Sequence, residues 1–134
     1  ISPLSKAKLK TLNKLKLKKY RFNTKSYLCE GYRLFTTACA SNSIDIQEVI
    51  LNDSFRKISY YSNVINICNQ YKIPIYNCTD KIFNSLSDEK SPSGIIFVMS
   101  LNYFKKSDIA KIKANSLISL LLRLSGYPLA LQRS

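Results

Sequence analysis

The stretch Lys18-Lys19-Tyr20-Arg21, followed by Phe22, combines side chains that could bind a nucleic acid. Ammonium and guanidinium groups can pair with backbone phosphates, and the ring of Tyr20 or Phe22 could stack on an unpaired base. Two other interpretations stay open: a solvated lysine face on a surface helix, or a basic amphipathic helix lying on an anionic membrane. The absence of any acidic residue in this part of the chain favours nucleic acid.

Positive charge is concentrated at the N-terminal end of the chain. The 134 residues include 21 Lys and Arg against 8 Asp and Glu, which gives a net charge of +13. Residues 1–29 carry nine of the basic side chains and no acidic one, so they supply +9 of this total. A polyanionic partner, and RNA in particular, is therefore expected. The expected contacts are Lys6, Lys10, Lys14, Lys18, Lys19, Arg21 and Arg33.

The composition excludes several kinds of catalytic or cofactor site. The chain has no histidine, so Ser-His and Cys-His nucleophile pairs cannot form, and its acidic residues are scattered. Its three glycines cannot build a dinucleotide-binding loop or a P-loop. The four cysteines form no CxxC pair and lie in apolar stretches, which indicates buried reduced thiols and no metal site. We therefore predict no catalytic, cofactor-binding or metal-binding residues in this chain.

The basic N-terminal residues are expected to lie on an amphipathic helix from Ser2 to about Lys19. Four leucines (4, 9, 12 and 15) fall within an arc of about 140° at 100° per residue, and Leu17 falls outside it. Pro3 suits the first turn of such a helix. Residues 21–25 are typical of a loop, and the lysines are expected on the outer face.

Strands and helices alternate in the rest of the chain. Helices are expected at 32–40 and 58–71, and a short one that Thr79 caps and that continues to Leu86. Strands are expected at 27–29, 45–51, 75–77 and 95–99, the last of them buried on both faces. This order predicts an α/β fold, a three-layer α/β/α sandwich with a mixed or largely parallel sheet. Residues 102–115 are typical of a connector, and 117–124 could begin another strand.

Three short motifs, taken in order, resemble a known family. They are Lys18-Lys19-Tyr20-Arg21, then residues 27–34 (YLCEGYRL), then residues 91–96 (SPSGII). Together they resemble the KKxR, FLxEGxRL and SPxGI pattern in the N-terminal substrate-binding domain of SpoU-family RNA methyltransferases, within the SPOUT superfamily. The resemblance covers about residues 5–100.

The resemblance implies a fold like that of ribosomal proteins that bind kinked RNA, placed ahead of a knotted catalytic domain. In the family, that second domain binds S-adenosylmethionine, usually dimerises, and transfers a methyl group to a ribose 2′-hydroxyl of ribosomal or transfer RNA. This chain would then select the RNA. The matching motif residues could either fix the backbone or touch RNA, and both interpretations stay open; they are Glu30, Gly31, Ser91, Pro92 and Gly94.

The C-terminal end matches the family less well. Residues 122–134 echo pieces of the motif DxxxPGNLGxxxRT, and Arg133 could correspond to its catalytic arginine, but Tyr127 would then replace the asparagine. We therefore assign no catalytic role and expect the chain alone to be inactive, with the catalytic knot and any homodimer contact absent from it. The alternative is a stand-alone RNA-binding or ribosome-associated protein of the same fold.

The expected organisation has three parts. Residues 1–25 form a basic helix and loop, residues 26–100 an RNA substrate-binding α/β domain, and residues 101–134 a linker with the start of a truncated catalytic domain. No segment reaches the length of a membrane span, and a cytoplasmic protein without membrane or metal partners is expected.

Overall fold

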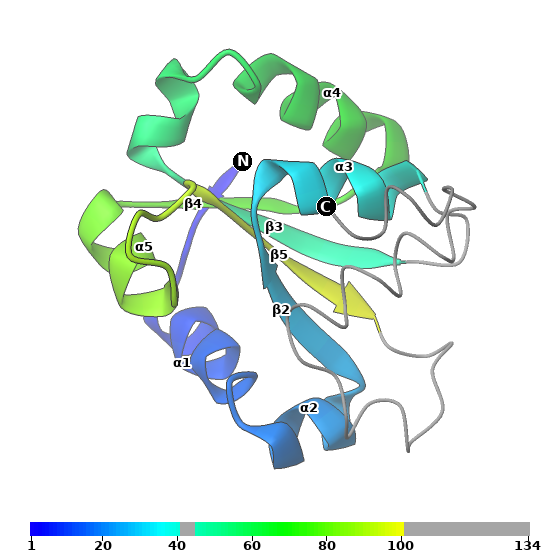
Figure 1. Ribbon diagram of the computed structural model, residues 1–134, viewed down its shortest axis with the longest axis vertical. Helices are drawn as coiled ribbons and strands as arrows, with labels where there is room; N and C mark the ends of the chain where they lie inside the picture. The colour runs from blue at the N-terminus through cyan, green and yellow to red at the C-terminus, as the bar shows by residue number, and fades with distance from the viewer. Residues whose placement is uncertain (41–44, 101–134) are drawn as a thin grey trace.

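A five-stranded sheet forms the centre of the computed structural model, which describes residues 1–40 and 45–100 (Figure 1). The strand order is β1-β4-β3-β5-β2. The strands are β1 (Ser2–Pro3), β2 (Ser26–Glu30), β3 (Ile46–Asn52), β4 (Ile75–Cys78) and β5 (Ile95–Ser100). The four strands expected from the sequence are confirmed, and β1 is an additional edge strand.

Among the strands of the described residues, only β5 runs against the direction of the others. β1, β4 and β3 are parallel neighbours, whereas β5 is antiparallel to both β3 and β2. The sheet is therefore mixed. The carboxyl ends of β1, β2, β3 and β4 and the start of β5 consequently meet at one edge of the sheet, which we call the carboxyl edge.

Helices cover both faces of the sheet, which confirms the predicted three-layer α/β/α sandwich (Figure 1). Helices α3 (Tyr32–Ala40) and α4 (Tyr61–Tyr71) pack on one face, and α1 (Lys6–Lys14) and α5 (Asp80–Leu86) pack on the other. Helix α2 (Lys18–Thr24) leads into β2, and a 3-10 helix, η1 (Asp53–Lys57), follows β3. None of the helices in the described ranges is long and apolar enough to cross a lipid bilayer.

The position of β5 inside the sandwich explains why its sequence is continuously apolar. Ile95, Phe97 and Met99 enter the core beneath α3 and α4, while Ile96 and Val98 enter the core beneath α1 and α5. Because side chains alternate along a strand and both faces are covered, every position of β5 is buried. The prediction of a strand buried on both faces is confirmed.

The single helix expected from Ser2 to Lys19 is wrong. Ser2 and Pro3 instead form the edge strand β1, where the missing proline N–H is tolerated. Ser5 then begins α1, because its Oγ accepts a hydrogen bond from the Lys8 amide at 3.1 Å. Helix α1 ends near Leu15, and a second helix runs from Lys18 to Thr24. Residues 21–25 were expected to form a loop, so that prediction is wrong for residues 21–24.

Most other boundaries agree with the sequence. The helix at 32–40 is confirmed, and Thr79 Oγ1 caps α5 by accepting from the Ile82 amide at 3.2 Å. Helix α4 begins at Tyr61 rather than at residue 58, because η1 and its exit turn occupy the preceding residues. The connector expected at 102–115 and the strand expected from 117 lie outside the described residues.

Helix α1 forms part of the same sandwich as the strands. Its Leu12 and Leu15 are buried together with Ile50 of β3 and Ile96 of β5. The division of the chain at residues 25 and 100 stays a prediction.

Candidate nucleic-acid interface

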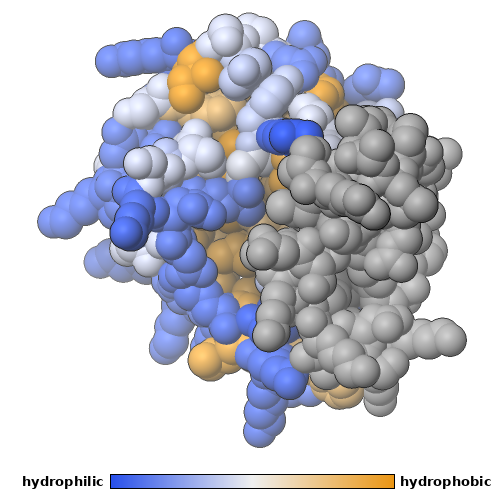
Figure 2. All heavy atoms as spheres, viewed as in Figure 1, coloured by the Kyte–Doolittle hydropathy of each residue, from blue (hydrophilic) through white to orange (hydrophobic). Residues whose placement is uncertain are grey.

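Five exposed lysines follow the outer side of α1 and the start of α2. Lys6, Lys10 and Lys14 are spaced by four residues, so they form one stripe along α1, opposite the buried leucines. Lys18 and Lys19 are exposed in the first turn of α2. We call these five residues the lysine face. Figure 2 shows hydrophilic side chains projecting from the region that α1 and α2 occupy in Figure 1.

Two other lysines of this region have carboxylate partners. Lys8 Nζ lies 2.6 Å from Glu48 Oε2, and Lys16 Nζ lies 3.4 Å from Asp88 Oδ1. The hydrogen bond to Glu48 raises the pKa of Lys8, although partial burial acts against it. Among the described residues, no carboxylate pairs with the lysine face. These five ammonium groups therefore remain available to an anionic partner.

Arg21 has a structural environment that differs from that of the lysine face. Its guanidinium donates to the carbonyl oxygens of Leu15 at 3.2 Å and Lys16 at 2.8 Å, and it lies 5.3 Å from the centre of the Tyr27 ring. These bonds satisfy carbonyl groups at the end of α1 and help to terminate that helix. An RNA contact of Arg21 stays a prediction, but its guanidinium already has these partners.

The two candidate stacking rings are also engaged within the protein. Tyr20 is half-buried against the core beneath α1 and α5, with Lys14 Nζ 5.5 Å from its ring centre. Phe22 packs against the opposite core. The two rings thus belong to opposite sides of the sheet, and neither projects from the lysine face as the sequence suggested.

Arg33 lies apart from the lysine face. It is exposed near the start of α3, which covers the sheet face opposite to α1. Strand β2 separates it from α2 along the chain. The structure therefore brings together five of the seven residues expected to bind RNA and leaves Arg21 and Arg33 in different surroundings.

The predicted motif residues meet at the carboxyl edge. Glu30 Oε1 accepts a hydrogen bond from Ser87 Oγ at 2.6 Å, and Glu30 Oε2 accepts from the Ser93 amide at 3.1 Å. The amide of Gly31 donates to the Ile95 carbonyl at 3.1 Å, and the Gly31 φ angle is +118°. Glu30 therefore joins the end of β2 to the turn that begins β5, which is a structural use of this carboxylate.

Gly94 is required at this turn for two separate reasons. Its φ angle is +88°, a conformation that other residues rarely adopt. A Cβ atom at this position would lie 2.9 Å from Asn52 Oδ1 and 3.1 Å from Phe55 Cδ2. Ser91 is exposed and Pro92 is half-buried in the same turn. Asn52, whose Oδ1 also accepts from the Phe55 amide at 2.9 Å, was not among the residues expected from the sequence.

The sequence of this chain matches a known protein family over most of its length. The family described as the MRM3-like substrate binding domain matches residues 6–96. The chain belongs to this family. This match confirms the resemblance to the substrate-binding domain of the SpoU family that the three sequence motifs carried.

Solved structures share the fold of this MRM3-like domain. An AdoMet-bound rRNA methyltransferase from Sinorhizobium meliloti is 16% identical, with a TM-score of 0.60 over 75% of this chain and 35% of that one. An RNA 2′-O ribose methyltransferase is 17% identical, with a TM-score of 0.61 over 78% of this chain and 38% of that one. A protein from Porphyromonas gingivalis assigned to the TrmH family of RNA methyltransferases is 17% identical, with a TM-score of 0.55 over 75% of this chain and 37% of that one.

The chain therefore spans little more than a third of the length of these structural relatives. No curated protein matches it in sequence.

The cysteines of the MRM3-like domain are reduced in the structure. Cys29, Cys68 and Cys78 are buried and Cys39 is half-buried. Burial raises the pKa of Cys39 and Cys78 to about 11 and that of Cys68 to about 12, so these thiols are protonated and unreactive near neutral pH. Within the described ranges, no group of three or more acidic or cysteine side chains could hold a metal ion.

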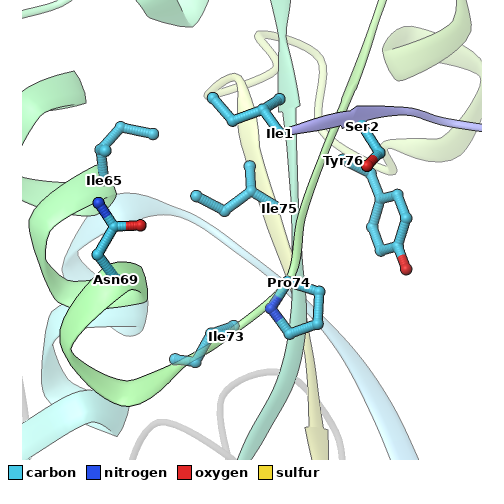
Figure 3. Close-up of a pocket in the computed structure, with 8 residues that line it drawn as sticks. All are labelled: Ile1, Ser2, Ile65, Asn69, Ile73, Pro74, Ile75 and Tyr76. Atoms are coloured by element: carbon cyan, nitrogen blue, oxygen red, sulfur yellow. The ribbon is translucent and has the colours of Figure 1, made fainter.

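A pocket of about 240 Å³ lies between β1, β4 and α4 of the MRM3-like domain. Figure 3 shows Ile1 and Ile75 beside each other, with Ile65 and Asn69 of α4 facing them. No Lys, Arg, Asp or Glu side chain lines this pocket. Its polar side chains are the uncharged ones of Ser2, Asn69 and Tyr76.

Proposed function

We propose that this domain binds RNA through the lysine face and thereby selects the substrate of a SpoU-type 2′-O-ribose methyltransferase. The observation that carries the proposal is the lysine face, whose five exposed lysines no carboxylate neutralises among the described residues. Each ammonium that pairs with a phosphate releases condensed counterions, which favours association.

RNA is the polyanion that the comparisons favour. The structural relatives are an rRNA methyltransferase, an RNA 2′-O ribose methyltransferase and a TrmH-family protein. A domain that binds RNA beside a catalytic domain raises the local concentration of the target ribose there. We assign no step of methyl transfer to the described residues.

The lysine face predicts different effects for two double variants of equal charge. Lys10→Ala with Lys14→Ala removes two members of the lysine face, whereas Lys8→Ala with Lys16→Ala removes two lysines that already have carboxylate partners. At about 0.15 M salt, two lost phosphate contacts should weaken binding to a structured RNA by roughly 10- to 30-fold. The control pair should change the affinity by less than about threefold.

The affinities can be measured by fluorescence anisotropy with a labelled RNA hairpin. Equal losses of RNA affinity in both double variants would contradict binding through the lysine face, because net charge alone would then determine the affinity. An unmodified chain that fails to bind any structured RNA would overturn the proposed function itself.

A further inference from the structure

Two tyrosines from different elements form a stacked pair near the carboxyl edge, on the side of the sheet opposite to the lysine face. The rings of Tyr32, at the start of α3, and Tyr60, just before α4, have centres 4.1 Å apart and planes that differ by 8°. Figure 1 shows the two helices packed on the same face of the sheet. The sequence did not indicate this pair, because the two residues are far apart in the chain.

The inner ring of the pair is fixed by the protein. Tyr32 packs against the core beneath α3 and α4, and its hydroxyl oxygen accepts a hydrogen bond from Asn63 Nδ2 at 2.6 Å. The backbone of Tyr60 is also held, since its carbonyl oxygen accepts from the Val64 amide at 3.1 Å in the first turn of α4. The pair is therefore ordered before any ligand arrives, which lowers the entropic cost of binding.

The outer ring of the pair is open to solvent. Tyr60 is 49% exposed although one of its faces covers Tyr32, and the neighbouring Ile58 is 39% exposed. Tyrosine rings usually bury most of their apolar surface. An exposed ring that rests on a fixed ring presents a flat surface of the size of a nucleobase.

Three basic residues are close in sequence to the two tyrosines. Arg33 follows Tyr32, and Arg56 and Lys57 precede Tyr60 by three or four residues, all three of them exposed. Asp53, at the first position of η1, is the acidic residue of the same segment. Asp80 also contacts this segment, because its carboxylate accepts from the Ser54 amide and interacts with Lys57. Three basic side chains against two acidic ones leave a net charge of +1, which favours the phosphates of a strand whose base stacks on the ring.

We infer that Tyr60, supported by Tyr32, is a stacking platform for an unpaired base of the bound RNA. The inference rests on the proposed function and extends it, because it names single-stranded or looped RNA as the feature that this second surface recognises. Arg33, which follows Tyr32 in the chain, lies on this side of the sheet and not on the lysine face. The other use of the pair would be only to hold α3 against α4.

Three variants separate these two uses. Tyr60→Leu removes the ring, Tyr60→Phe retains it, and Tyr71→Leu is a matched control. Tyr71 is 59% exposed at the other end of α4 and is also followed by a lysine, Lys72. Loss of one base stack should weaken binding by roughly 5- to 150-fold. We therefore expect this loss for Tyr60→Leu with a hairpin that carries an unpaired loop, near-normal binding for Tyr60→Phe and Tyr71→Leu, and no effect of any variant on a fully paired duplex.

A cross-linking measurement adds a readout that a purely structural role would not affect. With 5-iodouridine in the loop of the hairpin, irradiation should link the RNA to Tyr60, as peptide mass spectrometry would show. Normal affinity of Tyr60→Leu for the looped hairpin, or cross-links only elsewhere, would overturn the platform. A thermal melt of each variant would reveal unfolding, and if Tyr60→Leu does not fold, the cross-link of the unmodified chain decides the question.

The failure of the platform is distinguishable from the failure of the proposed function. If the lysine-face variant loses affinity for both RNAs while Tyr60→Leu loses none, only the platform is wrong. If the unmodified chain binds neither the hairpin nor the duplex, the proposed function is wrong as well.

Discussion

At the scale of single residues, the motif at the carboxyl edge serves to join strands. Glu30 accepts hydrogen bonds from Ser87 and Ser93, and Gly94 allows the turn to approach Asn52 closely. Asp80, at the start of α5, accepts a hydrogen bond from the Ser54 amide at 3.1 Å. The hydrogen bonds from Ser54 lower the pKa of Asp80, because they stabilise the ionised carboxylate that accepts them. The backbone conformation and hydrogen bonds of this turn therefore require Glu30 and Gly94, although their residue types could also suggest a binding site.

The two motif glycines should differ in their tolerance of a methyl group. Gly94→Ala should lower the free energy of unfolding by about 3 kcal/mol, because it adds backbone strain at positive φ and a collision with Asn52 and Phe55. Gly31→Ala should cost only about 1–2 kcal/mol, since its φ is +118° but no atom lies within 4 Å of the new Cβ. Urea unfolding of both variants measures the difference. Equal costs would show that close approach does not determine the choice of glycine at position 94.

At the scale of elements, α1 has two faces with separate roles. Its leucines are buried against the sheet and α5, while its lysines every fourth residue are exposed. The helix ends where Arg21 binds the carbonyl oxygens of Leu15 and Lys16. The position of the lysine face therefore depends on the packing of the opposite side of the same helix.

Two leucines near the end of α1 allow this dependence to be measured. Leu12→Ala should lower the free energy of unfolding by about 2–5 kcal/mol, because Leu12 is 1% exposed and its removal leaves a cavity. Leu17→Ala should change it by less than about 0.5 kcal/mol, because Leu17 is 62% exposed. Chemical denaturation followed by circular dichroism gives both values. A small effect of Leu12→Ala would mean that residues 1–25 fold independently of the sandwich.

At the scale of the whole molecule, charge is distributed unequally between the two sides of the sheet. The lysine face lies on the α1 side, and the smaller basic segment beside Tyr60 lies on the α3 and α4 side. The carboxyl edge contains the start of α1, η1 and the start of α3. This edge therefore connects the two sides of the sheet on which the basic surfaces lie.

The salt dependence of RNA binding should report the number of lysines in contact with phosphates. Five contacts predict that log K falls with log salt concentration with a slope of about −3.5 for single-stranded RNA to −4.5 for a duplex. The variant with alanine at positions 10 and 14 should reduce the magnitude of this slope by about 1.4–1.8, and the control pair at positions 8 and 16 should leave it unchanged. Titrations between about 50 and 200 mM salt provide the slopes. An unchanged slope in the first variant would mean that these lysines do not contact phosphates.

The sequence by itself determined the order of strands and helices after residue 26 and the concentration of charge before it. Hydrophobic periodicity predicted α3, β5 and the Thr79 cap of α5 because these features depend on local spacing and local hydrogen bonds. It also placed Leu12 and Leu15 on the buried side of α1. The family was predicted from three motifs whose residues are close in sequence.

Tertiary contacts decided the features that depend on residues far apart in the chain. The helix expected from Ser2 to Lys19 is divided because Ser2 and Pro3 pair with β4 and because Arg21 binds the end of α1. The roles of Glu30 and Gly94 depend on Ser87, Ser93 and Asn52, and the stack of Tyr60 depends on Tyr32. Periodicity describes which way a side chain faces along its own element, whereas these contacts form only when the sheet brings separate elements together.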